Sequence, residues 1–121
     1  NMKTIINRLL ALYPNCRIVV HRPLWYSPNT YNGAKYLEEG LRRLQDYYPQ
    51  IQRLVDYYAS HFPGQVFLGD TKGFDYFKEN HLTDFQAEKG SAGVFYLHPN
   101  EKGAVRLGEL WSEAIRQALG L

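Results

Sequence analysis

The sequence predicts an α/β fold in a single domain, and three observations lead to this class. Helical and strand patterns alternate along the 121 residues, in the order helix, strand, long helix, strand, helix. Both strand patterns, at residues 17–20 and 66–69, are apolar without polar alternation, which is typical of parallel strands covered on both faces. With 45% apolar residues, a chain of this length can build one core. We therefore expect parallel strands joined by helical crossovers.

The first helix is expected over residues 2–13. Its apolar residues recur at intervals of three and four, and Pro14-Asn15 stops the pattern. After the strand at 17–20, a loop is expected over residues 23–35, which contain two prolines, two further asparagines and a glycine. An apolar stripe then steps by four and three from Leu37 to Tyr58, and Pro49 interrupts it. This segment is predicted to be either a kinked helix or two helices in series.

The last part of the chain is expected to hold a strand at 66–69, a short helix or turn at 73–80, a polar loop at 81–93 and a final helix. Asn100 is a residue type that caps helices, and we expect the final helix to begin there. The predicted apolar face of that helix consists of Ala104, Leu107, Trp111, Ala114, Ile115 and Ala118.

Two short strands make an incomplete sheet. A single parallel pair would leave both of its outer edges unpaired, although parallel sheets are normally wider. We therefore expect the chain to associate with a second copy of itself or with a missing N-terminal half.

Composition and spacing argue against several classes of function. The net charge of +2 comes from 14 basic and 12 acidic residues mixed along the chain, so no nucleic-acid partner is expected. No apolar run is long enough for a membrane span. The single cysteine, Cys16, lacks a partner at metal-ligand spacing, the histidines at 21, 61 and 81 are isolated, and no phosphate-binding glycine motif occurs, so no metal or cofactor is expected. Asn1 resembles the remnant of an expression tag, with the reading frame beginning at Met2.

The candidate for chemistry is His98, in the stretch Phe95-Tyr96-Leu97-His98-Pro99-Asn100 ahead of the final helix. Imidazole titrates near neutral pH, so His98 could act as a general base. It could also be a turn residue that bonds a backbone carbonyl beside the helix cap, which is the commoner situation for such a histidine. The residues alone leave both interpretations open.

Nearly the whole chain resembles the C-terminal half of an SGNH (GDSL-type) esterase, of the bacterial kind that includes carbohydrate acetyl esterases. The resemblance rests on Leu12-Tyr13-Pro14-Asn15, the two strands, the loop His21-Arg22-Pro23-Leu24-Trp25-Tyr26, and above all Leu97-His98-Pro99-Asn100-Glu101-Lys102-Gly103. It implies a flavodoxin-like three-layer α/β/α sandwich of parallel strands, with the site at the carboxyl ends of the strands. It also implies a small ester substrate, such as an acetylated carbohydrate.

By the family's pattern, His98 is the catalytic base for a serine in a Gly-Asp-Ser segment that lies upstream of these residues, as would any export signal. The family commonly has an aspartate three residues before the histidine, where this chain has Phe95. Asp70 and Asp84 are the candidates for the orienting acid in its place. Trp25, Tyr26 and Tyr31 are expected either to wall the substrate cleft or to cover the edge of the core.

A different class of function is also consistent with the sequence. The chain could be a noncatalytic, truncated product, stable only by pairing its sheet edges with a second copy or with the missing half.

Overall fold

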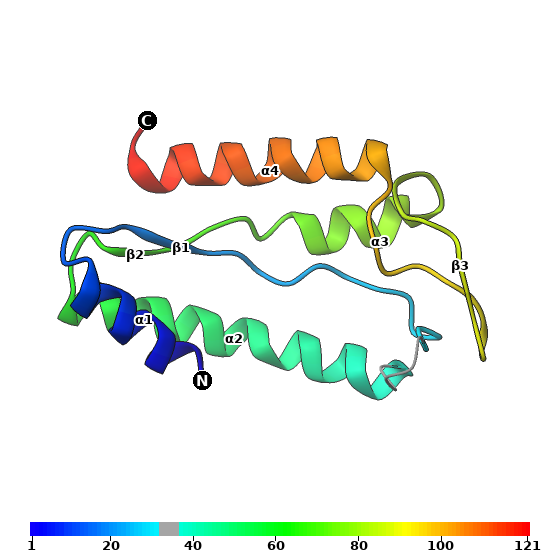
Figure 1. Ribbon diagram of the computed structural model, residues 1–121, viewed down its shortest axis with the longest axis horizontal. Coiled ribbons are helices and arrows are strands. Elements are labelled where there is room, and N and C mark those ends of the chain that lie inside the picture. Colours follow the sequence, from blue (N-terminus) through cyan, green and yellow to red (C-terminus); the bar gives the residue numbers. More distant parts are fainter. Residues whose placement is uncertain (32–36) are drawn as a thin grey trace.

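The computed structural model describes residues 1–31 and 37–121. In chain order its elements are α1 (Met2–Leu12), β1 (Ile18–Val20), α2 (Leu37–His61), β2 (Val66–Leu68), α3 (Gly73–Asp84), β3 (Glu88–Gly90), β4 (Gly93–Phe95) and α4 (Glu101–Leu119). The mixed α/β class is confirmed, with four helices and two small sheets in the described residues (Figure 1). The part of the predicted loop at residues 32–36 lies outside the described residues.

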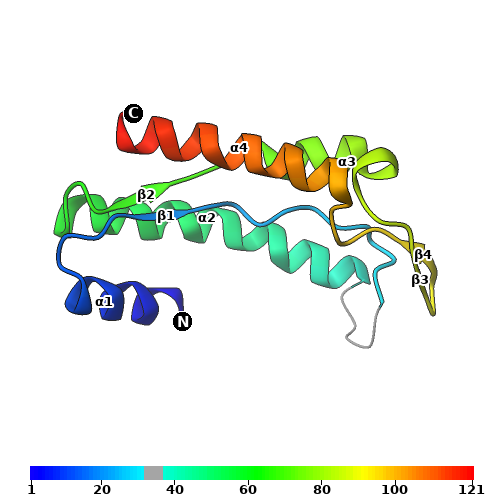
Figure 2. The same ribbon diagram turned by 45° about the horizontal axis from the view of Figure 1, so that its top comes forward.

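The two predicted strands pair in parallel, with Ile18 opposite Val66 and Val20 opposite Leu68. No third strand joins this pair among the described residues. Figures 1 and 2 show α1 and α2 on one side of the strands and α4 on the other. The start of α4, with the turn that carries His98, lies at the end of the molecule toward which β1 and β2 run (Figure 1).

Two hydrophobic clusters hold these elements together. The first joins α1, α2 and the strands through Ile6, Leu10, Tyr58 and Val66. The second joins α3, α4 and the loop after β1 through Trp25, Phe74, Phe77, Phe85 and Leu110. Each cluster combines residues distant in the sequence, so the core ties both ends of the chain to its middle.

Three expectations for the elements need correction. For the segment from Leu37 to His61, two alternatives were expected; the single helix that contains Pro49 is observed, and the alternative of two helices in series is the one to correct. The short helix expected at 73–80 continues to Asp84, past a non-helical Asn80, because its end packs on α4. The polar loop expected at 81–93 is therefore partly helix, and it also contains β3.

The hairpin formed by β3 and β4 was not expected because neither strand shows apolar alternation. β3 and β4 pair in antiparallel register, with Glu88 opposite Phe95 and Gly90 opposite Gly93. Ser91 and Ala92 form the turn, and Gly93 takes a φ of 95°, which glycine adopts at little cost. Pairing between the strands, and not local propensity, holds this hairpin together.

The buried stripe of α4 also differs from the expected face. Leu110 is only 6% exposed, whereas Trp111 is 39% exposed. Trp111 instead stacks on His21, with ring centroids 4.5 Å apart. The stripe that packs on α3 therefore runs through Gly103, Leu107 and Leu110.

Candidate active site

The turn that carries His98 is held by backbone hydrogen bonds to the segment after α3. Gln86 N donates to the carbonyl oxygen of His98 at 2.8 Å, and Asn100 N donates to the carbonyl oxygen of Asp84 at 2.9 Å. Phe85 and Pro99 form an antiparallel bridge between them. The backbone of His98 is thus anchored on both sides.

Asn100 caps α4, as expected. Its side-chain oxygen accepts a hydrogen bond from Gly103 N at 2.9 Å, and its backbone is extended, with φ −80° and ψ −173°. Its side-chain nitrogen donates to the carbonyl oxygen of Thr83 at 2.9 Å. One side chain therefore both starts α4 and ties it to the end of α3.

Gly103 lets α4 approach the end of α3 closely. A Cβ at this position would overlap the carbonyl oxygen of Asp84 and press on Pro99. Its backbone is ordinary helix, so the requirement for glycine is one of space. The glycine that follows the His-Pro-Asn stretch in the sequence thus sets the distance between the two helices that position His98.

The side chain of His98 forms a pair with Glu88 on β3. Nδ1 of His98 lies 2.9 Å and 3.1 Å from the two carboxylate oxygens of Glu88. The His98 side chain is 56% exposed, and that of Glu88 is 26% exposed. The ring is therefore open to solvent, not sealed in the core.

This geometry determines which nitrogen of the ring is free to react. A carboxylate accepts a hydrogen bond and donates none, so Nδ1 carries a proton that it donates to Glu88. In the neutral ring Nε2 is then the basic nitrogen. The same arrangement, a carboxylate on one nitrogen and a free second nitrogen, orients the histidine of serine hydrolases.

Asp84, one of the expected orienting acids, is fully buried and serves the packing of α3 on α4. Its carboxylate accepts hydrogen bonds from the hydroxyls of Tyr76 at 2.6 Å and Thr83 at 2.7 Å, and Lys102 Nζ lies 3.5 Å away. Burial raises the pKa of Asp84, but the two hydrogen bonds and the charge of Lys102 outweigh it, so the pKa is lowered overall. The hydrogen bond between the Tyr76 hydroxyl and Asp84 raises the pKa of Tyr76.

Asp70, the other expected acid, is buried at the start of α3. Its carboxylate accepts from Lys72 N at 3.1 Å and Gly73 N at 2.9 Å, which satisfies free donors at a helix N-terminus. Its backbone N–H donates to Nδ1 of His21 at 2.8 Å. Burial lowers the pKa of His21, while the charge of Asp70 opposes the shift. In the described residues the carboxylate on His98 is thus Glu88, and neither aspartate takes that position.

The three aromatic residues expected near the cleft lie in different settings. Trp25 is 6% exposed and packs in the cluster of Phe74, Phe77, Phe85 and Leu110, so it belongs to the core. Tyr26 is buried as well, and Tyr31 is half-buried, with its carbonyl oxygen close to Gly90. For Trp25 the geometry favours the core interpretation over the cleft wall.

No serine side chain hydrogen-bonds His98 within residues 1–31 and 37–121. Ser27 is buried and accepts from Tyr96 N at 2.8 Å, and Ser60 donates to the carbonyl of Asp56 at 3.5 Å. Ser91 lies in the hairpin turn, and Ser112 is exposed on α4. In the same described ranges, no group of three or more His, Cys, Asp or Glu residues could hold a metal ion.

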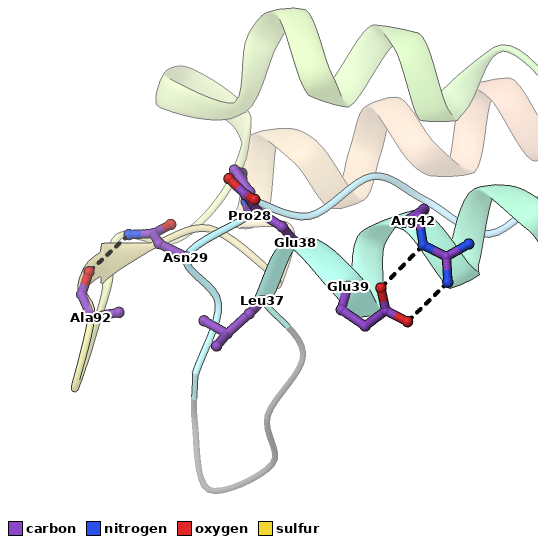
Figure 3. A pocket seen from close by; sticks show the side chains of 7 residues that line it. All are labelled: Pro28, Asn29, Leu37, Glu38, Glu39, Arg42 and Ala92. Carbon is purple, nitrogen blue, oxygen red and sulfur yellow. Dashed lines mark hydrogen bonds and ion pairs between the residues drawn. The ribbon is translucent and has the colours of Figure 1, made fainter.

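A large hollow lies between the loop after β1, the start of α2 and the hairpin turn (Figure 3). It measures about 760 Å³ and is lined by Pro28, Asn29, Leu37, Glu38, Glu39, Arg42 and Ala92. Four of these residues contact one another in pairs: Asn29 donates to the carbonyl of Ala92, and Arg42 pairs with Glu39. His98 and Glu88 are not among its lining residues.

Sequence reasoning missed Glu88, although a signal for it exists. Gly93 follows the dipeptide Ser91-Ala92, and a short turn followed by a glycine with positive φ is a common hairpin connection. Folding residues 88–95 back on themselves brings Glu88 opposite Phe95, three residues before His98. In this way Glu88 supplies a carboxylate where the aspartate expected at Phe95 is missing.

One further property of the described helices concerns membranes: none of them is both long and apolar enough to cross one. In comparisons with known proteins, no family model, no curated protein and no solved structure matches the chain.

Proposed function

We propose that this chain is the histidine-bearing part of a carboxylic ester hydrolase of the SGNH type, with His98 as general base and Glu88 as the residue that orients it. The observation that carries the proposal is the Glu88 carboxylate 2.9 Å from Nδ1 of a ring that remains 56% exposed. A histidine held on one nitrogen and open at the other is suited to proton transfer. The attacking hydroxyl comes from a segment other than the described residues.

In the proposed reaction, Nε2 of His98 takes the proton of a serine hydroxyl while the serine oxygen attacks the ester carbonyl. The imidazolium then donates that proton to the leaving alcohol, and an acyl-serine remains. Water attacks the acyl-serine in the same way, and the serine regains its proton. Glu88 keeps the ring in one tautomer and stabilises the imidazolium that forms twice in each cycle.

The arrangement of the strands supports the finer fold that we propose, a flavodoxin-like three-layer sandwich. In that fold the last two strands are neighbours and run in parallel, as β1 and β2 do. Ligands bind beyond the carboxyl ends of the strands, and the turn of His98 lies at that end of the molecule (Figure 1).

The proposed substrate is a small ester with a short acyl group, such as an acetylated carbohydrate. This substrate class is supported by the resemblance of residues 97–103 to the corresponding stretch of bacterial carbohydrate acetyl esterases.

The test is hydrolysis of an aryl acetate by the chain, and by the longer polypeptide if its reading frame holds an upstream Gly-Asp-Ser segment. His98→Ala should lower kcat by about 10²-fold or more, and Glu88→Gln by about tenfold with little change in KM. The matched control is His61→Ala, because His61 is also exposed but lies on α2, where it contacts the carbonyl of Tyr57. Equal activity of the His98→Ala and His61→Ala variants would remove His98 from the mechanism.

A second measurement tests the Glu88–His98 pair without any turnover. Nitrogen-15 spectra should show the proton of neutral His98 on Nδ1 and a mixture of tautomers after Glu88→Gln, while the signals of His61 stay unchanged. If His98 carries its proton on Nε2 in the unaltered chain, Glu88 does not orient it.

The alternative function, a noncatalytic chain stable only with a partner, is favoured by one observation. Both outer edges of the β1–β2 pair lack a further strand in the described ranges. Sedimentation velocity and thermal unfolding separate the alternatives, since a cooperative monomer would contradict obligate association.

A further inference from the structure

Arg22 lies just beyond the carboxyl end of β1. Its backbone N–H donates to the carbonyl oxygen of Asp70 at 2.9 Å, so the chain after β1 stays paired with the chain after β2. Ligands of open parallel sheets bind beyond this end of the strands. The backbone therefore fixes the side chain of Arg22 at an end of the sheet that suits a ligand.

The guanidinium of Arg22 is held by two aromatic rings. Its carbon Cζ lies 4.3 Å from the centroid of the Tyr48 ring on α2 and 4.1 Å from that of the Phe74 ring on α3. The rings attract the positive charge, but they offer no oxygen or nitrogen to accept its five N–H donors. The two contacts therefore hold the group in place and leave its hydrogen bonding unsatisfied.

No acceptor in the described residues takes up these donors. The Arg22 side chain has neither a hydrogen bond nor an ion pair within residues 1–31 and 37–121. Of the basic residues in those ranges, Arg22 and Arg106 are half-buried and the others are exposed. Arg106 donates to Glu109 at 3.0 Å. Arg22 has thus lost part of its water without gaining an acidic partner.

The nitrogens of Arg22 can be reached from outside. No side-chain nitrogen or oxygen of the described residues is fully buried without a hydrogen-bond partner. Because the nitrogens of Arg22 have no partner in those residues, each of them must have some contact with solvent. An acceptor that approaches from solvent can therefore bond to the guanidinium.

We infer that Arg22 binds the carboxylate of a small organic acid, while Tyr48 and Phe74 hold its guanidinium in position. Both groups are planar, and two parallel N–H···O bonds join them edge to edge. Exposed pairs of this kind gain little, because long side chains lose freedom and water screens the charge. At Arg22 the rings already restrict the guanidinium, and part of its water is gone.

The setting of Arg22 favours a small acid over a protein partner. Phe74 is buried and Tyr48 is half-buried, so the contact offers a protein little apolar surface to cover. Neither Glu88 nor His98 contributes to the site, so the inference is independent of the proposed hydrolysis.

The experiment follows the side-chain Nε–H signals of the arginines by nitrogen-15 NMR while sodium acetate replaces sodium chloride at constant ionic strength. The Arg22 signal should move and saturate, with a Kd on the order of 1–10 mM. Arg106 is the internal control, because it is also half-buried and lies over a ring, that of Tyr76, but pairs with Glu109. An Arg22 signal that does not saturate by about 100 mM acetate, or an equal movement of Arg106, would overturn the inference.

Variants test the role of the planar fork, with the ring protons of Phe74 as the reporter of binding. Arg22→Lys keeps the charge but loses the fork, so it should weaken acetate about tenfold. The matched change, Arg106→Lys, should leave the affinity as it is. Tyr48→Leu should weaken acetate about threefold by freeing the guanidinium. Circular dichroism checks that each variant is folded. If Arg22→Lys binds acetate as tightly as the unaltered chain, the charge alone attracts the anion and the assignment is wrong.

Two other occupants are outcomes of the same design. If sodium phosphate saturates the Arg22 signal at a lower concentration than acetate does, the ligand is a tetrahedral oxyanion and the carboxylate is wrong. If acetate leaves the signal unmoved and the chain forms a dimer that Arg22→Gln disrupts in sedimentation velocity, the acceptor belongs to a second copy and the small acid is wrong. Neither result bears on the hydrolysis test, so the two proposals fail separately.

Discussion

The region where α3 meets α4 and the side formed by α1 and β1 both carry apolar side chains on a helix surface. They differ in whether these side chains are covered by another element. Between α3 and α4, the polar groups on either side of Phe85 are hydrogen-bonded. The buried carboxylate of Asp84 accepts two hydrogen bonds, and Asn100 caps α4 and donates to the carbonyl of Phe85. On the side of α1 and β1, a stripe of apolar side chains on α1 is exposed to solvent, which consists of Met2, Ile5, Leu9 and Leu12. The outer edge of β1 has no strand beside it in the described residues. The first region is complete by itself, and the second has the features of an interface.

This difference separates two tasks in one chain. The α3–α4 region positions the His98 turn, because backbone hydrogen bonds from Gln86 and Asn100 and the cap of α4 hold that turn against the end of α3. The α1–β1 side contributes less to the stability of the isolated chain, because its exposed apolar groups gain nothing from folding until something covers them. Substitutions should therefore be costly in the first region and, on the exposed stripe of α1, nearly neutral.

The largest effect is expected within α1 itself, between adjacent isoleucines. Ile6 is 2% exposed and Ile5 is 60% exposed. Ile6→Ala should lower the free energy of unfolding by about 4 kcal/mol, because it leaves a cavity against Tyr58 and Val66. Ile5→Ala should change it by less than about 0.5 kcal/mol. Urea unfolding followed by circular dichroism measures both, and a large loss in the Ile5 variant would show that the stripe is already covered in the isolated chain.

The next effect concerns the close approach of α4 to α3. Gly103→Ala should lower the free energy of unfolding by about 3 kcal/mol, since the new Cβ meets a backbone carbonyl that cannot move aside easily. Gly108→Ala in the same helix is the control, because nothing lies within 4 Å of a Cβ there. That change should raise stability by about 0.5–1 kcal/mol through helix propensity. If both variants unfold alike, the packing of the two helices is looser than the geometry indicates.

The smallest of the three effects is also the one that depends on pH. Asp84→Asn should cost about 2 kcal/mol at neutral pH, because the buried group loses its charge and part of its hydrogen bonding. The pKa of Asp84 is lowered from its ordinary value of 3.8, so the ionised carboxylate stabilises the fold above that value. This contribution is lost as the pH falls through the lowered pKa of the folded state. Unfolding measured between pH 7 and pH 2 should show a shallower acid branch in the variant, and an unchanged branch would contradict the stabilising role of the ionised form.

Local patterns in the sequence were enough to predict α1, β1, β2 and the start of α4. Each of these has a periodic apolar stripe, a β-branched run or a capping residue, and the bounds agree to within about two residues. The exposed turn position of His98 could also be predicted, because Pro99 and Asn100 define it. The parallel pairing of β1 with β2 followed from their apolar character on both faces.

The remaining parts of the candidate site depend on contacts between residues that local patterns do not connect. Glu88 reaches His98 only because two glycines fold the hairpin back, and its own strand has no apolar signature. Asp84 and Asp70 were the acids expected from the sequence, but burial and nearby donors direct each of them to a helix end. For Trp25 the sequence left the cleft wall and the edge of the core as alternatives, and the packing of α3 and α4 decides for the core.

By itself, the sequence determined the order of α1, β1, α2, β2 and α4, the parallel pairing, the helix cap and the turn that carries His98, because these follow from interactions within a few residues of the chain or from apolar patterning. Only the tertiary structure decided which carboxylate meets His98, which aromatic rings are core and which side of the molecule stays open. Those choices depend on which distant segments come together, and a side chain has no orientation or burial until they do.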